Sequence, residues 1–468
     1  MLTRRVHFIG IGGTGLSAIA VVLLERGLEV SGSDKHASPV LTRLQQAGAR
    51  IMFTHHADNV QGADVVVRSS AVSDDNIEVQ AAKIAGIPVL KRSEFLEQLL
   101  ADTKTIAVAG SHGKTTTTAM IAWMLHQLGL DPSYIIGSTS INLASNAHAG
   151  TGEYFVIEAD EYDGMFLGLA PTVAIVTNVE HDHPDCYPTQ HSYQQAFREF
   201  VQKIVPAGVL VACQDDPGAA HLAGEFRKQG GKSLVYGLNS SNLDYSARDL
   251  SLNASGSYDF TMFARDGEET AQVALQVPGI HNVRNALAAL SVAEILELPL
   301  SQSAQALGAF RGTGRRFEVR GEPGGVVVID DYAHHPSEIR TTLEAARTRY
   351  RNRRIWAVWQ PHTFSRTRML RTEFCMSFES VDRVIVTEIY AAREEAPQDG
   401  FSSLSLVQEM RQHQRMAEKT VDFAATLEEA KRLLQQNLKH GDVVIVLSAG
   451  DANRISDELI ENPAWVRA

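Results

Sequence analysis

The chain of 468 residues has few cysteines, no excess of positive charge and no long uninterrupted apolar run. Its three cysteines, Cys186, Cys213 and Cys375, are widely spaced, which excludes a disulfide framework or a C-x-x-C metal pair and favours a reducing, cytoplasmic location. The formal net charge of −12 argues against a nucleic-acid or anionic-membrane partner, since no net-positive field would attract one. No apolar stretch is long enough for stable membrane insertion.

The apolar N-terminal stretch that follows Arg4 and Arg5 resembles a signal peptide only superficially. Four glycines interrupt it, the charged pair Glu25 and Arg26 follows it, and no small-residue cleavage site is evident. We therefore interpret this stretch as part of the folded protein.

The length of the chain exceeds what one hydrophobic core supports and predicts about three domains. Three successive blocks alternate between strand-length and helix-length segments, with breaks near 98–104 and 311–314. The pattern therefore predicts an α/β protein with domains at 1–100, 101–313 and 314–468. The first and third are expected to be Rossmann-like, and the second to be a P-loop-type ATPase domain with a parallel sheet and a small antiparallel patch at 232–277.

A glycine-rich turn, GIGGTG at 10–15, follows the first predicted strand, Val6–Ile9. A helix and a second strand come next, and Asp34 lies 19 residues after the last glycine. This order is typical of a Rossmann-type site for a dinucleotide or a nucleotide sugar. The alternative is a tight turn in an α/β core that binds no ligand. A further predicted strand, Ala63–Ser70, ends in small polar residues at the same sheet edge, where ligands bind in such folds.

The segment AVAGSHGKTTTTAM, at 107–120, resembles a phosphate-binding loop whose first glycine is displaced. The common P-loop, G-x-x-x-x-G-K-[ST], requires glycine at Val108, but here the glycine is Gly110. A predicted strand precedes the segment and a helix follows it, so we interpret it as a variant loop. Lys114 would contact phosphates and Thr115 would offer a hydroxyl to Mg²⁺. The alternative is a threonine-rich helix N-terminus.

Two acidic segments, EADEYD at 158–163 and NVEHDH at 178–183, each follow a predicted strand. Carboxylates at strand ends beside a phosphate loop are suited to Mg²⁺, although an acidic run is often only a solvated turn. His181 and His183 also allow a zinc site. We favour one histidine near a second Mg²⁺ and the other as scaffold.

Four further segments contain candidate groups for binding anions or substrates. They are GIHNVRN at 279–285, GRRFE at 314–318, DYAHHP at 331–336 and QPHTFSRTR at 360–368. Each has a structural alternative: helix capping by Asn282, a surface ion pair, histidine caps and a solvated basic loop, respectively.

Taken together, these motifs and SGSD, SSAV, IYAAREE and SAGD resemble the Mur ligase superfamily of ATP-dependent amide-forming enzymes, over essentially the whole chain. Their order and the segments GRRFE, DYAHHP and QPH point to its alanine-adding branch. The resemblance implies a ligase that joins L-alanine to the carboxylate of UDP-N-acetylmuramate through an acyl phosphate, in peptidoglycan precursor synthesis. It implies a UDP-sugar-binding first domain, an ATPase second domain and an amino-acid-binding third domain that closes over ATP.

The resemblance also implies roles for individual residues. Lys114, Glu161 and His183 are expected to be catalytic, with Thr115, Glu161 and His183 as ligands of two Mg²⁺ ions. Contacts with ATP are expected from Gly110, Ser111, His112, Gly113, Lys114, Thr115, Thr116, Asn282, Asn285, Arg316 and Asp331. The UDP-sugar is expected at Gly10, Gly12, Gly13, Thr14, Gly15, Ser33, Asp34, Ser69 and Ser70. The amino acid is expected at His335, His362 and Arg366.

The chain departs from the pattern of the superfamily at two positions. Some relatives have arginine where this chain has Thr363, so the amino-acid carboxylate is expected to depend more on Arg366. Other members use a carbamoylated lysine where this chain has Phe197, so we expect no such group here.

Four other functions fit parts of the sequence. Within the superfamily they are a muropeptide-recycling ligase and a folate-type ligase. Outside it they are a regulatory or transport ATPase and, from the first block alone, an NAD-dependent dehydrogenase. We expect small-molecule substrates, no nucleic-acid partner and a monomer or homodimer.

Overall fold

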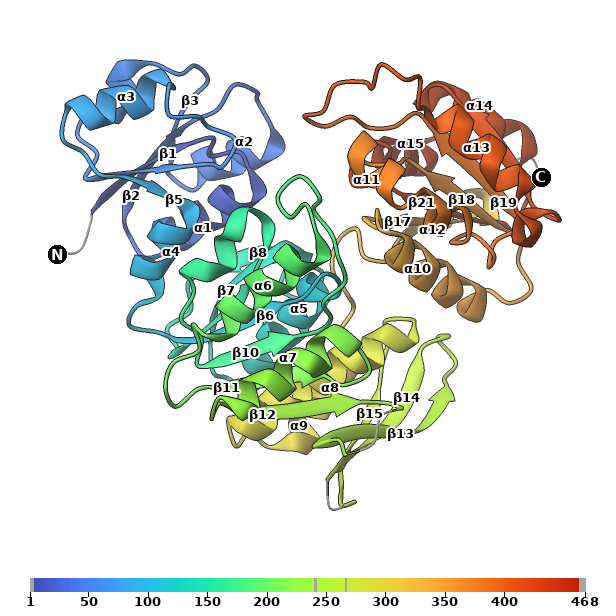
Figure 1. The fold of residues 1–468 in the computed structure, drawn as a ribbon, viewed down its shortest axis with the longest axis horizontal. Helices are drawn as coiled ribbons and strands as arrows, with labels where there is room; N and C mark the ends of the chain where they lie inside the picture. Colours follow the sequence, from blue (N-terminus) through green and yellow to red (C-terminus); the bar gives the residue numbers. More distant parts are fainter. Residues whose placement is uncertain (1–3, 240–241, 266, 463–468) are drawn as a thin grey trace.

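Three separate sheets form the fold, one in each predicted segment (Figure 1). The computed structural model describes residues 4–239, 242–265 and 267–462. The predicted class, α/β with three domains, is confirmed. In the view of Figure 1 the N-terminal domain lies at the upper left and the C-terminal domain at the upper right. The central domain lies below and between them.

The N-terminal sheet is parallel throughout, in the order β3-β2-β1-β4-β5. Its strands are β1 (Arg5–Ile9), β2 (Glu29–Ser33), β3 (Arg50–Met52), β4 (Val65–Arg68) and β5 (Val89–Lys91). The connecting helices are α1 (Thr14–Glu25), α2 (Pro39–Gln46), η1 (Ala57–Val60), α3 (Ile77–Ile84) and α4 (Arg92–Leu100). Apolar strands buried on both faces require such helical crossovers.

The central sheet has ten strands in the order β15-β14-β13-β12-β11-β10-β6-β9-β7-β8. They are β6 (Lys104–Ala109), β7 (Ser133–Ser140), β8 (Ser145–His148), β9 (Tyr154–Glu158), β10 (Val173–Val176), β11 (Val209–Cys213), β12 (Lys232–Gly237), β13 (Tyr245–Leu252), β14 (Tyr258–Ala264) and β15 (Glu269–Ala274). The predicted antiparallel patch began too early, because β12 is parallel to β11 and only β13, β14 and β15 pair antiparallel there. Helix α7 (Pro217–Lys228) separates β11 from β12, and a helical crossover produces parallel neighbours.

Helices cover both faces of the central sheet. They are η2 (Tyr162–Gly168), α5 (Lys114–Gln127), α6 (Gln190–Val201), α8 (Ile280–Ile295) and α9 (Leu300–Gly308), together with α7. Helices α5 and α8 share one apolar core, in which Met120 and Leu125 of α5 lie with Leu287 of α8. The packing places the start of α5 beside the second turn of α8, since an added Cβ on Gly113 would lie 2.9 Å from Asn285 Oδ1.

The C-terminal sheet has the order β16-β17-β21-β18-β19-β20 and is parallel except for its edge strand β16. The strands are β16 (Glu318–Gly321), β17 (Val327–Asp331), β18 (Ile355–Trp359), β19 (Arg383–Thr387), β20 (Thr420–Ala424) and β21 (Val443–Leu447). The helices are η3 (Pro323–Gly325), α10 (Pro336–Arg349), α11 (Phe364–Met369), α12 (Arg371–Cys375), α13 (Ser403–Gln412), η4 (Gln414–Met416), α14 (Leu427–Asn437) and α15 (Asn453–Glu461).

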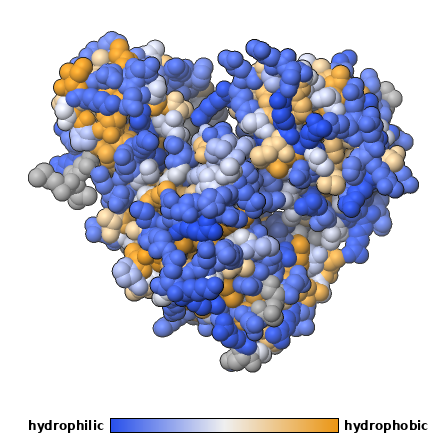
Figure 2. Space-filling model, viewed as in Figure 1, coloured by the Kyte–Doolittle hydropathy of each residue, from blue (hydrophilic) through white to orange (hydrophobic). Residues whose placement is uncertain are grey.

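Polar groups join the central domain to both of its neighbours. Arg92 of α4 forms an ion pair with Asp160 at 3.0 Å, and Arg366 of α11 forms one with Asp182 at 2.9 Å. Figure 2 shows a mostly hydrophilic surface with a notch between the N-terminal and C-terminal domains. Across the described residues, we find no helix with the length and apolar character needed to cross a bilayer.

Candidate active site

Three predicted motifs meet at the carboxyl end of the central sheet because their strands are neighbours. The GSHG loop follows β6, EADEYD begins at the end of β9, and NVEHDH follows β10. Strand β6 lies between β9 and β10, and all three are parallel. Motifs separated by up to about 70 residues of sequence therefore converge on one edge, where open α/β sheets bind ligands.

The displaced glycine of the phosphate loop has a structural explanation. Val108 belongs to β6, is fully buried and is the register partner of Ile175 and Glu158, so no glycine is required there. The turn begins at Gly110, whose φ of 137° is favourable only for glycine. An added Cβ on Gly110 would lie 2.0 Å from Thr177 Oγ1. The close packing of this loop on the end of β10 thus requires glycine at 110.

Residues of the NVEHDH segment hold the loop in shape. Asn178 Oδ1 accepts a hydrogen bond from the His112 N–H at 2.8 Å. The Ser111 hydroxyl donates to the Glu180 carbonyl at 2.6 Å and accepts from the Glu180 N–H at 2.8 Å. The motif had suggested a metal ligand and a scaffold histidine, and the role of Asn178 in holding the loop was missed. A loop fixed before phosphate arrives loses less entropy on binding.

Lys114, the first residue of α5, is paired with Glu161 across the loop. Its Nζ lies 2.8 Å from Glu161 Oε2 and donates to the Gly110 carbonyl at 2.5 Å. Burial alone would raise the pKa of Glu161, but Lys114 and His183 outweigh it and hold that pKa at about 2. The Tyr193 hydroxyl also donates to Glu161 Oε1 at 3.0 Å. Lys114 is therefore charged and within reach of the loop that would hold phosphate.

Of the three predicted metal ligands, Glu161 and His183 lie together, whereas Thr115 pairs with another carboxylate, Glu158. His183 Nε2 lies 3.5 Å from Glu161 Oε1, whereas the Thr115 hydroxyl donates to Glu158 Oε1 at 3.0 Å. Glu158 was not among the predicted ligands, although it is the first acid of EADEYD and ends β9, a position that could have singled it out. Hydroxyl and carboxylate oxygens of this kind fit Mg²⁺. His181 instead contacts the carbonyl of Tyr187 at 2.8 Å, as expected for a scaffold residue.

A second group of side chains joins NVEHDH to the C-terminal domain. Asp182 is buried and accepts from Arg366 Nε at 2.9 Å, and Arg366 Nη1 lies 3.1 Å from His362 Nδ1. Burial alone would raise the pKa of Asp182, but Arg366 and His183 hold it well below its usual range. Burial lowers the pKa of His362 to about 4, so this imidazole is neutral near pH 7. His362 and Arg366, predicted together, are thus adjacent.

Thr363 supports this group with an uncommon backbone. It has φ 64° and lies directly before α11, which contains Arg366. A β-branched residue in this region is strained, and such strain is found mostly at functional sites. His183, at φ 54°, is a second case beside the same group.

His335, which was predicted at the amino-acid site with His362 and Arg366, packs against the phosphate loop. Its ring packs at 4.8 Å from that of His112, and its Nδ1 accepts from the Ser337 N–H as the N-cap of α10. The neighbouring His334 packs edge-on against His362 at 5.9 Å. The capping alternative for these histidines is therefore confirmed for His335.

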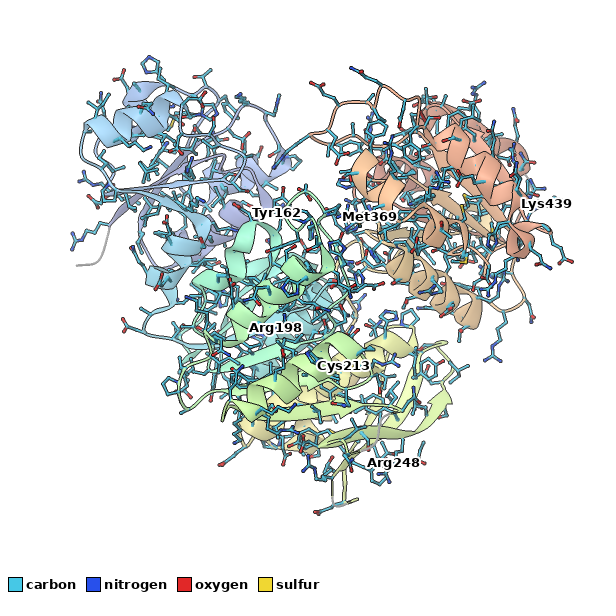
Figure 3. All side chains as sticks on the ribbon, viewed as in Figure 1. Tyr162, Arg198, Cys213, Arg248, Met369 and Lys439 are labelled. Carbon is cyan, nitrogen blue, oxygen red and sulfur yellow. The ribbon has the colours of Figure 1, made fainter. Side chains whose placement is uncertain are left out.

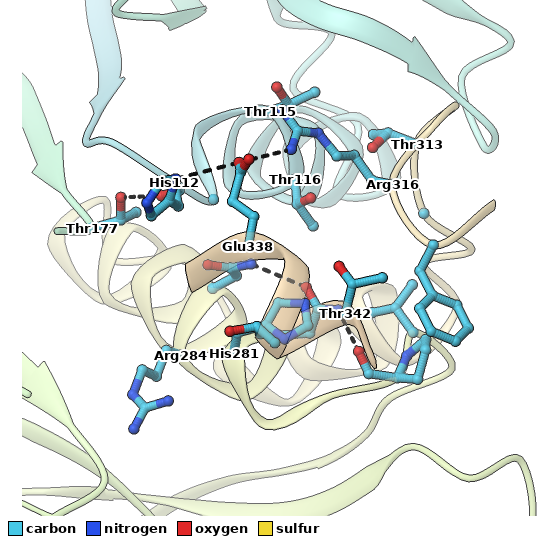
Figure 4. A pocket seen from close by; sticks show the side chains of 18 of the residues that line it. His112, Thr115, Thr116, Thr177, His281, Arg284, Thr313, Arg316, Glu338 and Thr342 are labelled. Atoms are coloured by element: carbon cyan, nitrogen blue, oxygen red, sulfur yellow. Dashed lines mark hydrogen bonds and ion pairs between the residues drawn. The ribbon is translucent and has the colours of Figure 1, made fainter. Parts of the chain in front are cut away.

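A cavity of about 540 Å³ lies between the central and C-terminal domains beside the loop (Figure 4). The predicted ATP residues that line it are His112, Gly113, Thr115, Thr116, Asn282, Asn285, Arg316 and Asp331. Cys213 at the end of β11, labelled in Figure 3, also lines it. Burial lowers the pKa of His281 to about 4, which leaves a neutral imidazole in the lining. Gly110, Ser111 and Lys114 of the predicted ATP residues do not line it.

The helix-capping alternative for Asn282 is wrong. Gly279 is the N-cap of α8, and the Asn282 amide donates to the carbonyl of Pro278 at 2.7 Å. Asn282 Oδ1 accepts from the Asn285 amide at 3.0 Å. The two amides therefore orient each other at the wall of the cavity.

Arg316 is a cavity residue and its ion pair is not a surface one. It pairs with Glu338 at 3.2 Å, and the side chain of Glu338 is only 8% exposed. Figure 4 shows Glu338 between Arg316 and His112. Glu338 was missed, although the pattern H-P-S-E at 335–338 is a capping-box signal. Burial raises the pKa of Asp331 to about 6 at the same wall.

The glycine loop of the N-terminal domain has the geometry of a Rossmann turn. The Gly12 N–H donates to Asp34 Oδ2 at 2.9 Å, and Gly13 is the N-cap of α1, which begins at Thr14. An added Cβ on Gly10 would lie 3.1 Å from Ser69 Cβ, so these loops touch.

Two serines predicted to bind the UDP-sugar differ in where they point. Ser33 is fully buried, and its hydroxyl donates to Glu78 at 2.5 Å. Ser70, after β4, is exposed beside the loop. Ser33 therefore supports the turn from below, whereas Ser70 is free to face a ligand.

Three family models match the chain in the order of its three sheets. They are the Mur ligase family catalytic domain at residues 5–104, the Mur ligase middle domain at 108–293 and the Mur ligase glutamate ligase domain at 315–450. The chain belongs to the Mur ligase family. Mur ligases are ATP-dependent, in agreement with the loop and cavity described above.

Similar proteins match this Mur ligase over nearly its full length. A UDP-N-acetylmuramate–L-alanine ligase of Oleidesulfovibrio alaskensis is 44% identical over 95% of this chain and 96% of its own. A solved UDP-N-acetylmuramate-alanine ligase of Thermotoga maritima has a TM-score of 0.82 and 29% identity, and the match covers 98% of each chain. A murein peptide ligase of Psychrobacter arcticus has a TM-score of 0.71 and 28% identity over 99% of each chain.

Proposed function

We propose that this Mur ligase joins L-alanine to the carboxylate of UDP-N-acetylmuramate and converts ATP to ADP and phosphate, as a step of peptidoglycan precursor synthesis. The observation that supports this most is the position of the Lys114, Glu161 and His183 group. It lies between the phosphate loop and the buried Asp182–Arg366 pair. The names of the relatives at 40–44% identity agree with this substrate pair.

The first step would bring two anions together. The muramyl carboxylate attacks the γ-phosphorus of ATP, the bond to the β–γ bridging oxygen breaks, and an acyl phosphate and ADP result. Two unit charges about 4 Å apart repel by about 4 kcal/mol at an effective dielectric of about 20. Lys114, Arg316 and the N-terminus of α5 would offset this repulsion as charge develops on the phosphoryl oxygens.

The residues present fit Mg²⁺, because hydroxyl and carboxylate oxygens meet beside the loop. We place one ion at Thr115 and Glu158, and a second between Glu161 and His183, which adds Glu158 to the predicted set. When bound, Mg²⁺ supplies positive charge that lowers the repulsion between the reacting anions. Lys114 would then turn from Glu161 toward the phosphates.

The second step would take place at the domain junction. The neutral alanine amine attacks the acyl carbon, phosphate leaves with the bonding electron pair, and the nitrogen loses one proton as the amide forms. We assign the alanine carboxylate to Arg366, with His362 beside it, because this arginine is held rigidly by Asp182. Closure of the C-terminal domain over the central one would exclude water from the acyl phosphate.

We assign the UDP-sugar to the N-terminal domain, with the diphosphate at the loop from Gly10 to Gly15. The N-terminus of α1 offers N–H groups there, and Asp34, Ser69 and Ser70 lie beside it. We also infer a cytoplasmic location from the three unpaired cysteines and either a monomeric or a homodimeric state.

Phosphate release measured with ATP, UDP-N-acetylmuramate and one amine at a time tests this function. We expect turnover with L-alanine, less with glycine or L-serine, and little with L-glutamate or a tripeptide. Preference for the tripeptide would instead favour a muropeptide ligase, a second candidate because of the murein peptide ligase fold match at 28% identity. Phosphate release without the sugar nucleotide would indicate a regulatory ATPase and overturn the proposal.

A further inference from the structure

A cluster of two histidines and a glutamate lies at the contact between the central and C-terminal domains. His112 comes from the phosphate loop, Glu180 from NVEHDH and His335 from the turn before α10. His112 Nε2 lies 3.0 Å from Glu180 Oε2, and His335 Nδ1 lies 3.9 Å from the same oxygen. One ligand atom from each of the three lies within 4.8 Å of the others. Three segments distant in sequence thus present donors to one point.

The donor set differs from that of the Mg²⁺ positions proposed above. Those positions are formed mostly by hydroxyl and carboxylate oxygens, whereas this cluster has two imidazoles and one carboxylate. Imidazole nitrogen suits Zn²⁺ and similar ions, and two histidines with one glutamate is a known three-ligand set for zinc with one open position. Mg²⁺ prefers oxygen ligands, so it would compete poorly here.

Neighbouring groups orient these donors as they would around a bound metal. His112 Nδ1 lies 3.3 Å from Glu338 Oε1, so the carboxylate can accept from the ring nitrogen that faces away from Glu180. The Ser337 hydroxyl donates to Glu180 Oε1 at 2.6 Å and leaves Oε2 toward the histidines. Carboxylates and hydroxyls in this outer position fix the orientation of metal ligands.

One ligand of the cluster is buried, and the other two are partly open, so a small ion can reach it. His335 is 2% exposed, and its Nδ1 already accepts from the Ser337 N–H. Its Nε2, which has no hydrogen-bond partner among the described residues, is therefore the nitrogen left free for an ion. Glu180 lines both the cavity of about 540 Å³ and a second one of about 850 Å³, of which His335 is also a wall. An ion could therefore enter from the second cavity without passing through the nucleotide site.

We propose that His112, Glu180 and His335 form a site for a divalent transition-metal ion of the Zn²⁺ class, which fastens the phosphate loop to the C-terminal domain. Two ligands come from the central domain and one from the C-terminal domain, so the complete site exists only when the two are in contact. A bound ion would favour this arrangement by mass action. Since ADP must leave between the same domains, occupancy of the site would slow turnover.

Titration of the full chain with Co²⁺, followed by its visible absorption, tests the site directly. Excess Mg²⁺ fills the oxygen-rich positions, and ATP is omitted because it binds metal itself. We expect one equivalent of Co²⁺ with the intense bands of four-coordinate geometry, displaced by Zn²⁺. Glu180→Gln, at a side chain that is 42% exposed, and His335→Gln should each weaken binding by about tenfold or more.

His221→Gln is the matched control, because His221 lines the second cavity but lies outside the cluster. The His221→Gln variant should bind Co²⁺ like the unaltered chain. In a turnover assay, Zn²⁺ should inhibit the unaltered chain and His221→Gln equally. It should not inhibit the residual turnover of Glu180→Gln. A thermal melting curve confirms that each variant is folded. The further variant Glu338→Gln keeps all three ligands and should weaken Co²⁺ binding less than either ligand variant. Absence of saturable Co²⁺ binding in the unaltered chain, or binding in both ligand variants as tight as in the unaltered chain, would overturn the proposal.

Discussion

The two glycine-rich loops of this Mur ligase are built alike but are supported by different chemistry. Each follows the first strand of its domain and precedes a helix, α1 or α5. Each is backed by a buried carboxylate with a pKa held at about 2, Glu78 for the first loop and Glu161 for the second. The two carboxylates differ in their partners. This difference separates a carboxylate that only supports a loop from one that belongs to a reaction centre.

Glu78 is surrounded by groups of its own domain. It accepts from Ser33 at 2.5 Å and Asn59 at 2.5 Å, and it contacts His55 at 2.9 Å. The carbonyl of Ser33 in turn accepts from the Gly10 N–H at 2.8 Å, so this cluster holds the first loop. These partners all belong to the N-terminal domain, and none of them is a cation that phosphate would attract away.

Glu161 instead pairs with Lys114, a cation that the second loop needs for phosphate. A diphosphate that is only bound can be held by neutral N–H groups, whereas a phosphoryl group that is transferred requires mobile positive charge. The comparison teaches that burial and a low pKa do not by themselves mark catalysis. Catalysis is indicated instead by a charge pair in which a substrate can take the place of one partner.

Lys114→Ala should separate the two loops most strongly. Removal of the cation should lower kcat by about 10³-fold, because charge on the phosphoryl group is stabilised mainly in the transition state. Affinity for UDP-N-acetylmuramate, measured by calorimetry without ATP, should stay unchanged. Lys104→Ala is the control, because Lys104 is an exposed lysine of β6 that is paired with Glu153. Loss of UDP-sugar binding in Lys114→Ala would contradict the division of roles.

Glu78→Gln should weaken the N-terminal domain without changing the chemical step. The folded pKa of about 2 lies below the ordinary 4.5, so the ionised carboxylate contributes about 3 kcal/mol above pH 4.5, and this is lost as the pH falls toward 2. Amide hydrogen exchange of β1 and β2 should show a loss of up to this size at pH 7 and no acid dependence from this group. Exposed Glu97→Gln is the control, and equal protection in both variants would refute the structural role.

Gly110→Ala should damage the second loop through both strain and collision. A left-handed φ costs a non-glycine residue about 1–2 kcal/mol, and the added Cβ would also displace Thr177. Gly129→Ala, at the end of the same helix, has φ 76° with no atom within 4 Å of the added Cβ, and isolates the strain. The melting temperature should fall in both glycine variants, whereas the affinity for ATP should fall only in Gly110→Ala. Equal ATP affinities would show that the close packing at Thr177 is unimportant.

Local patterns predicted the elements well because the strands are short apolar runs bounded by glycine turns. The order of strand, loop and helix around Gly10 and Gly110 is local in sequence, so both turns were found. The sequence shows that valine replaces the expected glycine at position 108, but it could not explain why. The reason is that Val108 belongs to a strand and pairs with Glu158, 50 residues away.

Relations between segments could not be predicted, because they depend on side-chain direction at domain contacts. The sequence grouped His335 with Arg366, yet the start of α10 turns His335 toward His112 and its neighbour His334 toward His362. Likewise, nothing local indicates that the Ser33 hydroxyl points inward to Glu78.

Arg92→Ala should give the smallest effect and test whether the first loop has any cation at all. Arg92 Nη1 would lie 2.2 Å from an added Cβ on Gly15, so the missing side chain of Gly15 admits the guanidinium to the N-terminus of α1. If Arg92 contacts the diphosphate, its loss should raise KM for the UDP-sugar about tenfold, or about 1.4 kcal/mol, with kcat changed little. Its pair with Asp160 is partly exposed, so stability should change by less than about 1 kcal/mol. Lys83→Ala is the control, because it removes a paired cation elsewhere in the same domain. An unchanged KM in Arg92→Ala would mean that N–H groups alone bind the diphosphate.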